Sequence, residues 1–326
     1  MRVLIAEDDP LSRALLERAL HRSGYEVTSV EDGVQALCQL TQPNSPRLAL
    51  LDWVMPNKTG IEVCGEVRKR QGRAYTYLIV LSSKESKQDI VQGLEAGADD
   101  YLTKPCDVEE LKARLRVGER ILELEDRLVE ARESMRFQAT HDLLTSLWNR
   151  GVILELTARE VERSRREKNC AAVIMCDIDH FKQVNDEYGH SVGDDVLREV
   201  AQRLQRSVRS YDMVGRYGGE EFLVVLNRCK PESALGRAEN LRQAIERNPV
   251  TKGDRVVPVT ISVGIALSRN FEGAGLERII QEADAALYEA KRSGRNCVRM
   301  ARSKKEEETS AEESTVIRAE TTLTRK

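Results

Sequence analysis

Five short apolar runs recur through the first 118 residues, and they constrain the fold of this chain more than any other feature. The runs lie at 3–6, 27–30, 48–51, 77–81 and 101–102, and helical segments separate them. Strands that alternate with helices along a chain form a parallel sheet with helices on both faces. We therefore predict a doubly wound, parallel α/β domain for residues 1–118.

Polar side chains directly follow four of these runs: Glu7, Asp8 and Asp9, then Asp52, then Ser82, and then Lys104. Ligands of such folds bind beyond the carboxyl ends of the strands. An acidic cluster with one lysine at that edge is suited to magnesium and a phosphoryl group. Helix caps and surface charge explain each residue singly, but they do not explain why all of them lie at strand ends.

A second feature is the sequence Gly218-Gly219-Glu220-Glu221, with strand-like segments at 213–217 and 222–226. This pattern is typical of a hairpin with acids at its tip. Glycine permits positive φ and lets a ligand approach the backbone. Adjacent acids repel each other, so they do not stabilise a hairpin. They are better explained as ligands of a divalent metal beside a phosphate. The alternative is an ordinary solvated turn, because short motifs often match by chance.

An acidic position also ends the apolar run 173–176, where Asp177 follows a predicted buried strand. A carboxylate there, facing the acidic hairpin, would hold magnesium against nucleotide phosphates. Lys182 can reach a phosphate as a point charge. Asn185 and Asp194 can accept the N1–H and N2 amine of guanine.

Between these regions, residues 111–138 contain no proline and a single glycine, Gly118, which favours one long helix. Its apolar residues recur in steps of four and three, as in a coiled-coil seam: Val117, Ile121, Leu124, Leu128, Ala131 and Met135. The seam is short, so an amphipathic helix packed on its own domain is the alternative.

Composition narrows the remaining possibilities. The chain has 326 residues, which suggests about two domains, and its net charge of −3 does not indicate nucleic-acid binding. We expect no membrane insertion and no signal peptide, because no apolar run is long enough and Met1 leads straight into a strand. Seven single cysteines without a CxxC pair favour a reducing, cytoplasmic setting.

Five motifs in order give residues 140–302 a resemblance to the GGDEF family of diguanylate cyclases, which condense two GTP into cyclic di-GMP. They are 141–150 (HDLLTSLWNR), the Asp177 strand, 218–222 (GGEEF), 260–266 (TISVGIA) and 283–296 (ADAALYEAK through GRN). The resemblance implies an α+β, nucleotide-cyclase-like domain with a ferredoxin-like core. Two positions depart from the usual pattern: Glu220 replaces an aspartate, which keeps the ligand, and Ser146 replaces a glycine.

The same resemblance assigns roles to individual residues. The metal, Mg²⁺ or Mn²⁺, would be held by Asp177, the Ile178 carbonyl and Glu220, with Glu221 helping to hold a second ion. Glu220 would also accept the proton of the attacking 3′-hydroxyl, and Lys182 would stabilise the transition state. Substrate would be bound by Gly218, Gly219, Asn185, Asp194, Lys291 and Arg295.

Five residues, 213–217, separate the segment that runs from Arg209 to Asp212 from the hairpin glycines. In the family, an Arg-x-x-Asp at this spacing is the inhibitory product site, and an auxiliary arginine often comes from the next helix. Arg237 and Arg242 are both candidates for that role. The alternative is an exposed helix end with a weak i,i+3 ion pair.

The first 118 residues resemble a response-regulator receiver of flavodoxin-like fold, because Asp52-Trp53-Val54-Met55-Pro56 and Thr103-Lys104-Pro105 match its motifs. The resemblance implies that Asp52 takes phosphate from a cognate histidine kinase. Glu7, Asp8, Asp52 and the Val54 carbonyl would bind Mg²⁺ or Mn²⁺. Ser82 and Lys104 would hold the phosphoryl oxygens, and Tyr101 would be the aromatic switch.

Together these patterns predict four parts: a receiver at 1–118, a helical coiled-coil linker at 119–140, a GGDEF domain at 141–302 and a disordered charged tail at 303–326. We expect a cytoplasmic, phosphorylation-controlled diguanylate cyclase with product inhibition, which acts as a homodimer through its linker and receiver. The alternatives are a silent module that binds product, a cyclase for another purine, and a receiver-controlled scaffold.

Overall fold

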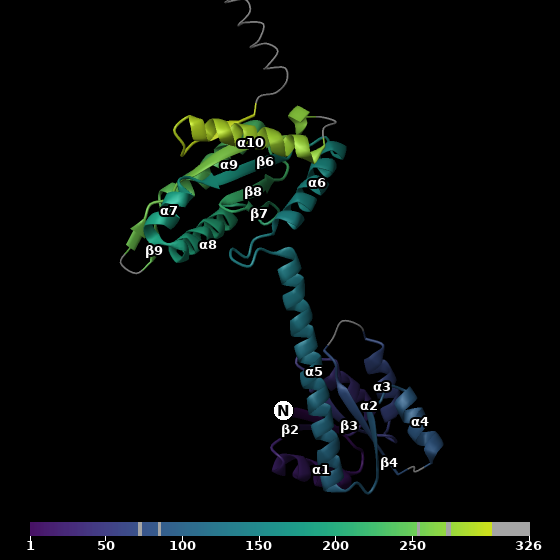
Figure 1. The fold of residues 1–326 in the computed structure, drawn as a ribbon. Helices are drawn as coiled ribbons and strands as arrows, with labels where there is room; N and C mark the ends of the chain where they lie inside the picture. The colour runs from purple at the N-terminus through teal and green to yellow at the C-terminus, as the bar shows by residue number, and fades with distance from the viewer. Residues whose placement is uncertain (71–73, 84–85, 253–254, 272–274, 302–326) are drawn as a thin grey trace, which may run out of the picture. The chain divides into compact units, whose positions relative to one another are not determined.

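The computed structural model describes residues 1–70, 74–83, 86–252, 255–271 and 275–301, so the predicted tail at 303–326 lies outside the described residues. Contacts divide the chain into two compact units, Met1–Ser134 and Met135–Lys326. Figure 1 shows each unit as a sheet with helices packed against it.

The first unit is the predicted parallel sheet. Its strands are β1 (Arg2–Ala6), β2 (Glu26–Val30), β3 (Leu48–Asp52), β4 (Tyr77–Ser82) and β5 (Asp100–Thr103). Its helices are α1 (Pro10–Arg22), α2 (Gly33–Leu40), α3 (Gly60–Arg68), α4 (Lys87–Glu95) and the first part of α5 (Val108–Thr140). The strand order β2-β1-β3-β4-β5, with every neighbouring pair parallel, confirms the flavodoxin-like fold.

Both faces of the strands β1, β3 and β4 are buried, which is why these strands are apolar runs without alternation. Leu4 and Leu51 belong to the core beneath α2 and α3. Ile5 and Leu50 belong to the opposite core, with Leu16 of α1 and residues of α5. The carboxyl ends of β1, β3, β4 and β5 are left to carry the polar residues that follow them.

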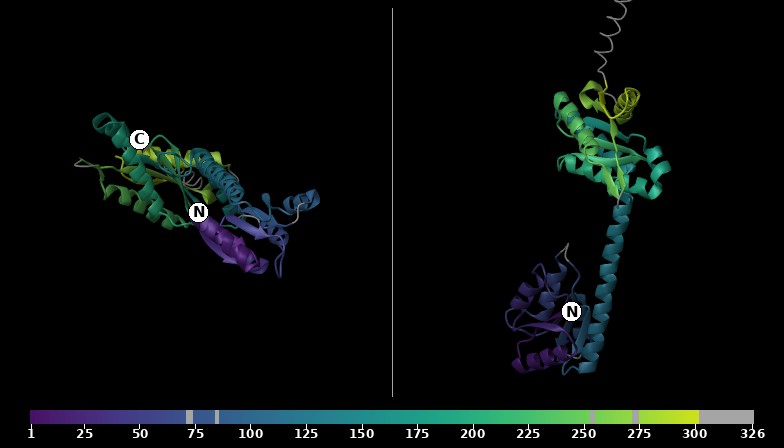
Figure 2. Two further views of the ribbon diagram at one scale, coloured as in Figure 1. Left: turned by 90° about the horizontal axis from the view of Figure 1, so that it is seen from below. Right: turned by 90° about the vertical axis from the view of Figure 1, so that its left-hand side faces the viewer.

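Helix α5 is one unbroken helix of 33 residues (Figure 2). Its first half packs on the sheet through Leu111, Leu115 and Leu122, which are at most 1% exposed. Gly118 lies where a Cβ atom would come within 2.6 Å of Tyr77, so the lone glycine permits close packing of helix on sheet. The predicted boundary at 118 therefore falls inside a helix.

The second unit contains α6 (Arg150–Arg166), α7 (Phe181–Tyr188), α8 (His190–Ser207), α9 (Pro231–Glu246), α10 (Leu276–Arg292) and a 3₁₀ turn, Ser268–Phe271. Its main sheet contains β6 (Ala172–Ile178), β7 (Met213–Gly218), β8 (Glu221–Leu226), β11 (Ile261–Leu267) and β12 (Val298–Met300), in the order β12-β11-β6-β8-β7. A separate hairpin joins β9 (Val250–Lys252) and β10 (Arg255–Val257). The four strands β11-β6-β8-β7 pair antiparallel in the order of a ferredoxin-like core.

The side-chain period of two along β6 decides which helices its residues meet. Ile174 and Cys176 lie in the core that α8 and α9 cover. Val173 and Met175 lie in the opposite core, beneath α6 and α10. Asp177 is two residues after Met175, so its side chain lies on the same face of the sheet, the face that α10 covers.

Candidate functional site

Three carboxylates converge at the carboxyl edge of the first sheet. Glu7, Asp8 and Asp52 each offer an oxygen within 4.8 Å of the others, and they are the only such group of potential metal ligands among the described residues. Glu7 and Asp52 are buried, whereas Asp8 is exposed. Burial raises the pKa of Glu7, and the nearby charge of Asp52 raises it further. A hard divalent cation would relieve this repulsion, so the residues fit Mg²⁺ or Mn²⁺.

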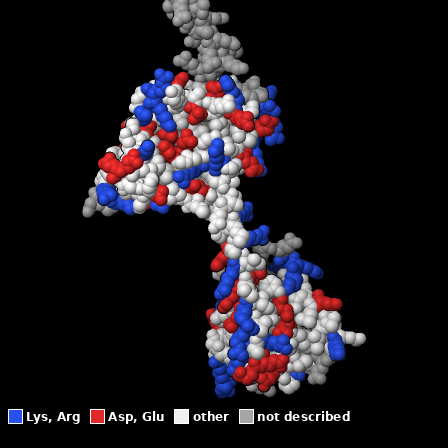
Figure 3. All heavy atoms as spheres, viewed as in Figure 1, with Lys and Arg blue, Asp and Glu red and all other residues white. Residues whose placement is uncertain are grey.

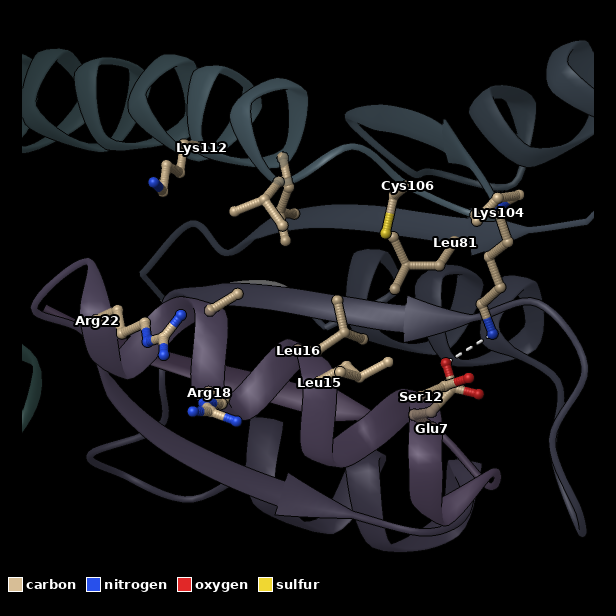
Figure 4. A pocket seen from close by; sticks show the side chains of 14 residues that line it. Glu7, Ser12, Leu15, Leu16, Arg18, Arg22, Leu81, Lys104, Cys106 and Lys112 are labelled. Atoms are coloured by element: carbon tan, nitrogen blue, oxygen red, sulfur yellow. Dashed lines mark hydrogen bonds and ion pairs between the residues drawn. The ribbon is translucent and has the colours of Figure 1, made fainter.

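Lys104 bridges two of these carboxylates. Its Nζ lies 2.6 Å from Glu7 Oε2 and 3.0 Å from Asp52 Oδ2. Burial alone would lower the pKa of Lys104, but the ion pairs with Glu7 and Asp52 raise it, so the ammonium stays charged. A cavity of about 810 Å³ between α1 and the start of α5 has Glu7 and Lys104 among the residues that line it (Figure 4).

The other predicted receiver residues lie on or just after strands β3, β4 and β5. Ser82 ends β4 and is buried, and Val54 is 62% exposed two residues after Asp52. Tyr101 is buried rather than exposed, and its ring meets Trp53 edge-on with centroids 6.2 Å apart. Trp53 follows Asp52 directly, so the Tyr101 ring is coupled by packing to the residue beside the predicted phosphoacceptor.

In the second unit, strand register brings the predicted acids together. Asp177 of β6 pairs with Glu221 of β8 in the antiparallel ladder, and the Ile178 N–H donates to the Glu220 carbonyl at 3.3 Å. Gly219 adopts φ +49°, in the left-handed region that the tight turn requires. Glu220 therefore stands at the hairpin tip beside the end of β6.

Lys291 of α10 also reaches this position. Its Nζ lies 2.8 Å from Asp177 Oδ2, on the face of the sheet that α10 covers. Burial raises the pKa values of Asp177 and Glu221. The charge of Glu220 raises the pKa of Asp177 further, and the charge of Asp177 raises that of Glu221. Within the described residues, the side chains of Asp177, Glu220 and Glu221 do not form a ligand cluster as compact as the one in the first unit.

The two residues expected to recognise guanine lie on neighbouring helices. Asn185 is in α7, and Asp194 is in α8, directly after Gly193. A Cβ atom on Gly193 would come within 2.0 Å of Asn185 Oδ1, so glycine at 193 makes room for the amide next to Asp194. Lys182 is exposed at the start of α7. Arg295 is exposed in the turn after α10.

The two predicted product-site residues, Arg209 and Asp212, differ in their exposure and in their contacts. Asp212 is buried and accepts hydrogen bonds from the backbone N–H groups of Arg209 and Asn227. Its ion pair is with Arg237 of α9, and Arg209 instead contacts Tyr211 through its side chain. The weak i,i+3 ion pair considered from the sequence is therefore not formed.

Arg242, the other arginine considered for that site, forms its contacts with other residues. It pairs with Glu239 and Glu246 on its own helix and donates to Asn296 Oδ1. Of the two candidates, only Arg237 contacts Asp212 in the described structure. The sequence could not choose between them because both lie on α9.

Sequence reasoning gave no role to three side chains that shape the second site. Arg216 donates to the Gly219 carbonyl at 2.9 Å and to both carboxylate oxygens of Asp142 at 3.1 Å. Asp179 is buried and accepts hydrogen bonds from Thr260, Ser262 and the backbone of Asn296. Only the repeated acid in Asp177-Ile178-Asp179 signalled Asp179 in the sequence.

Charges of both signs are mixed over the face of each unit in Figure 3, without one continuous basic surface. Among the described residues, no helix combines the length and apolarity that crossing a bilayer requires.

Two family models match the chain. The model described as "Response regulator receiver domain" matches residues 3–116, and "Diguanylate cyclase, GGDEF domain" matches residues 139–297. The matched ranges contain the two groups of site residues described above.

Two curated relatives are similar to the chain over long segments. The chain is 30% identical over 299 residues to the response regulator PleD of Caulobacter vibrioides, covering 91% of this chain and 65% of PleD. It is 38% identical over 170 residues to diguanylate cyclase DosC of Escherichia coli, covering 52% of this chain and 36% of DosC. The chain thus spans less than two thirds of the length of either protein.

A solved structure of the coiled coil and GGDEF domain of DgcB from Caulobacter crescentus, in complex with c-di-GMP, matches with a TM-score of 0.51 and 32% identity. The match covers 59% of this chain and 99% of that one. The two domain matches, with the PleD similarity over 91% of the chain, show that the chain joins a response regulator receiver domain to a GGDEF domain.

Proposed function

We propose that this protein is a diguanylate cyclase that condenses two GTP into cyclic di-GMP and two pyrophosphates. The observation that carries the proposal is the register of β6 and β8, which sets Asp177 beside Glu221 and Glu220 at the tip of a glycine turn. Lys291 approaches the same carboxylates from α10. Acids with a nearby lysine support this proposal, because a nucleoside triphosphate binds through divalent metal and positive charge.

The acidic residues fit a divalent metal, because burial and neighbouring negative charge raise the pKa values of Asp177 and Glu221. Asp177, Glu220 and the Ile178 carbonyl would hold Mg²⁺ or Mn²⁺, with Glu221 beside a second ion. When bound, the metal supplies charge neutralisation at the phosphates and at the departing pyrophosphate. Lys291 would then exchange Asp177 for a phosphate oxygen.

The protein's side chains supply positioning and proton transfer. Glu220 accepts the proton of the 3′-hydroxyl as that oxygen bonds to the α-phosphorus of the second GTP and pyrophosphate leaves. Lys182, Lys291 and Arg295 hold phosphate oxygens, whose negative charge would otherwise oppose the attack. Two such transfers close the ring of cyclic di-GMP and release two pyrophosphates.

Recognition of guanine belongs to the α7–α8 pair. Asn185 and Asp194 together present the amide and carboxylate oxygens that accept the N1–H and the N2 amine of guanine. An adenine offers neither donor at that edge, so the half-buried carboxylate of Asp194 would be left unpaired. The same pair therefore argues for GTP over ATP.

The receiver controls this activity through phosphorylation of Asp52 by a histidine kinase. Glu7, Asp8, Asp52 and the Val54 carbonyl hold the divalent metal, and Lys104 balances the added phosphoryl charge with Ser82. The Tyr101 ring, packed on Trp53, is the element that would respond to the new charge.

A homodimer completes the reaction, because the two-fold symmetric product needs two GTP, one in each active site. The seam predicted on α5 supports this: Leu124, Leu128 and Met135 are 63%, 65% and 69% exposed, although they are apolar. Pairing of two such helices would bury them. The receiver contributes the rest of the dimer contact.

Product inhibition involves Arg209, which is exposed, and Asp212, which Arg237 holds in place. Arginine recognises guanine and phosphate through its bidentate fork. Arg237 is the auxiliary arginine in this proposal, because it already lies against Asp212.

The test is incubation of the purified full chain with GTP and Mg²⁺, followed by chromatography and mass spectrometry for cyclic di-GMP. Formation of cyclic di-GMP with two equivalents of pyrophosphate is the expected result. A protein that binds product without making it would instead be a sensory module. Turnover of ATP would reveal a cyclase of different purine choice, and inertness toward nucleotides would leave only a scaffold.

A further inference from the structure

Asp179 connects three separate segments of the second unit. Its carboxylate accepts hydrogen bonds from Thr260 Oγ1 at 2.7 Å and Ser262 Oγ at 2.6 Å, which lie at the start of β11. It also accepts the Asn296 backbone N–H at 3.0 Å. The side chain is 94% buried, so these three donors replace its hydration. Its own N–H donates to the Thr260 carbonyl, which fixes the residue against β11.

The segment held by Asn296 is a strained turn after α10. Gly294, Arg295 and Asn296 adopt φ values of +106°, +64° and +44° in succession. A left-handed backbone is unfavourable for residues other than glycine, and two such residues in a row persist only where the surroundings fix them. The Asn296 N–H bond to Asp179 is one such restraint.

We propose that Asp179 is a positioning residue that sets the place of Arg295 against the substrate triphosphate by holding this turn. The inference rests on the proposed function, because Arg295 has a phosphate role only if GTP binds here. Asp179 itself touches no substrate group in this assignment. It acts two residues from Asp177, and so one buried carboxylate aligns the phosphate-binding turn with the strand that carries the acids.

A second restraint on the turn provides a matched control. The Asn296 side chain donates to Glu246 and accepts from Arg242, both on α9. Asn296→Gly removes these contacts, keeps the N–H that Asp179 binds, and suits the positive φ. If Asp179 is the restraint that matters, this variant should bind nucleotide nearly as well as the wild type.

The experiment measures binding of 3′-deoxy-GTP with Mg²⁺ to the full chain by calorimetry, because this analogue lacks the attacking hydroxyl. Asp179→Ala should weaken binding by about tenfold, the effect of losing one or two buried hydrogen bonds to a charged group. Asp179→Asn should recover part of the affinity, because its amide oxygen still accepts the Asn296 N–H. If Asp179→Ala does not fold, the binding measurement is made with Asp179→Asn instead.

Double variants test whether Asp179 acts on nucleotide binding through Arg295. In an Arg295→Ala background, loss of Asp179 should cost less than about twofold, whereas in an Asn185→Ala background it should cost the full tenfold. Equal losses in both backgrounds would overturn the inference, because Asp179 would then act on the fold in general. A wild-type protein that does not bind the analogue would overturn the proposed function, and the inference with it.

Discussion

The two units gather acidic residues by different means. In the receiver, Glu7, Asp8 and Asp52 follow parallel strands that end at one edge, and their oxygens lie within 4.8 Å of one another. In the GGDEF domain, Asp177 and Glu221 meet through the register of an antiparallel pair, and Glu220 depends on a glycine turn. Lysine approaches both sites, as Lys104 in the first and Lys291 in the second.

This difference indicates how each site tolerates change. Topology alone assembles the receiver cluster, since every parallel strand delivers its end to the same edge. The GGDEF acids require a correct register, because a slip of one residue would move Asp177 to the other face of the sheet. Arg216 supports that arrangement by linking the Gly219 carbonyl to Asp142.

The largest expected effect comes from Glu220→Gln, which keeps the shape of the hairpin tip but removes its charge. The initial rate of cyclic di-GMP synthesis should fall at least about a hundredfold, the usual contribution of a general base. Circular dichroism should show an unchanged fold. Glu232→Gln, the same substitution at an exposed residue of α9, is the control. Activity near wild type in Glu220→Gln would remove Glu220 from the mechanism.

The second largest expected effect is activation of synthesis through the receiver. Beryllofluoride with Mg²⁺ should raise the rate of synthesis in the wild type by about five- to 150-fold, the usual range of allosteric coupling. Asp52→Asn should keep the basal rate and lose this response. A variant that still responded at the receiver would contradict phosphorylation control through Asp52.

Much of this arrangement could be predicted from the sequence, for reasons that particular residues show. Apolar runs identified β1, β3 and β6, and the Gly218–Gly219 pair identified the hairpin, because these patterns are local. The partner of Asp212 was not predictable, since Arg237 and Arg242 share a helix and only packing separates them. Asp179 was missed because its donors come from residues 260, 262 and 296, far away in the sequence.

A smaller effect concerns the helix that the two regions share. Leu128 lies on the predicted seam of α5 and Val129 lies beside it, and both are exposed, at 65% and 46%. Leu128→Glu should weaken dimerisation by roughly tenfold or more, because it places like charges across a coiled-coil contact, and synthesis should fall with it. Val129→Glu should leave both unchanged. Sedimentation that showed equal dimer fractions for the two variants would exclude this seam.

The smallest expected effect on the initial rate comes from Arg209→Ala, which should leave synthesis unchanged and act only on feedback. Arg209 is exposed, and among the described residues its side chain bonds to Tyr211 rather than to the hairpin acids, so we expect turnover not to depend on it. Loss of the Arg209 guanidinium should weaken the binding of cyclic di-GMP by roughly 1–3 kcal/mol, the range for hydrogen bonds to charged groups.

Arg237 is the poorer target, although it belongs to the same proposed site. Its removal would leave Asp212 charged, buried and without its ion-pair partner, which destabilises the fold as well as the site. Arg206→Ala, at the exposed end of α8, is the better control. Progress curves and calorimetric titration of cyclic di-GMP should separate Arg209→Ala from both the control and the wild type. Equal product affinity in all three proteins would leave Arg209 as an ordinary residue of the loop after α8, and would confine regulation to the receiver.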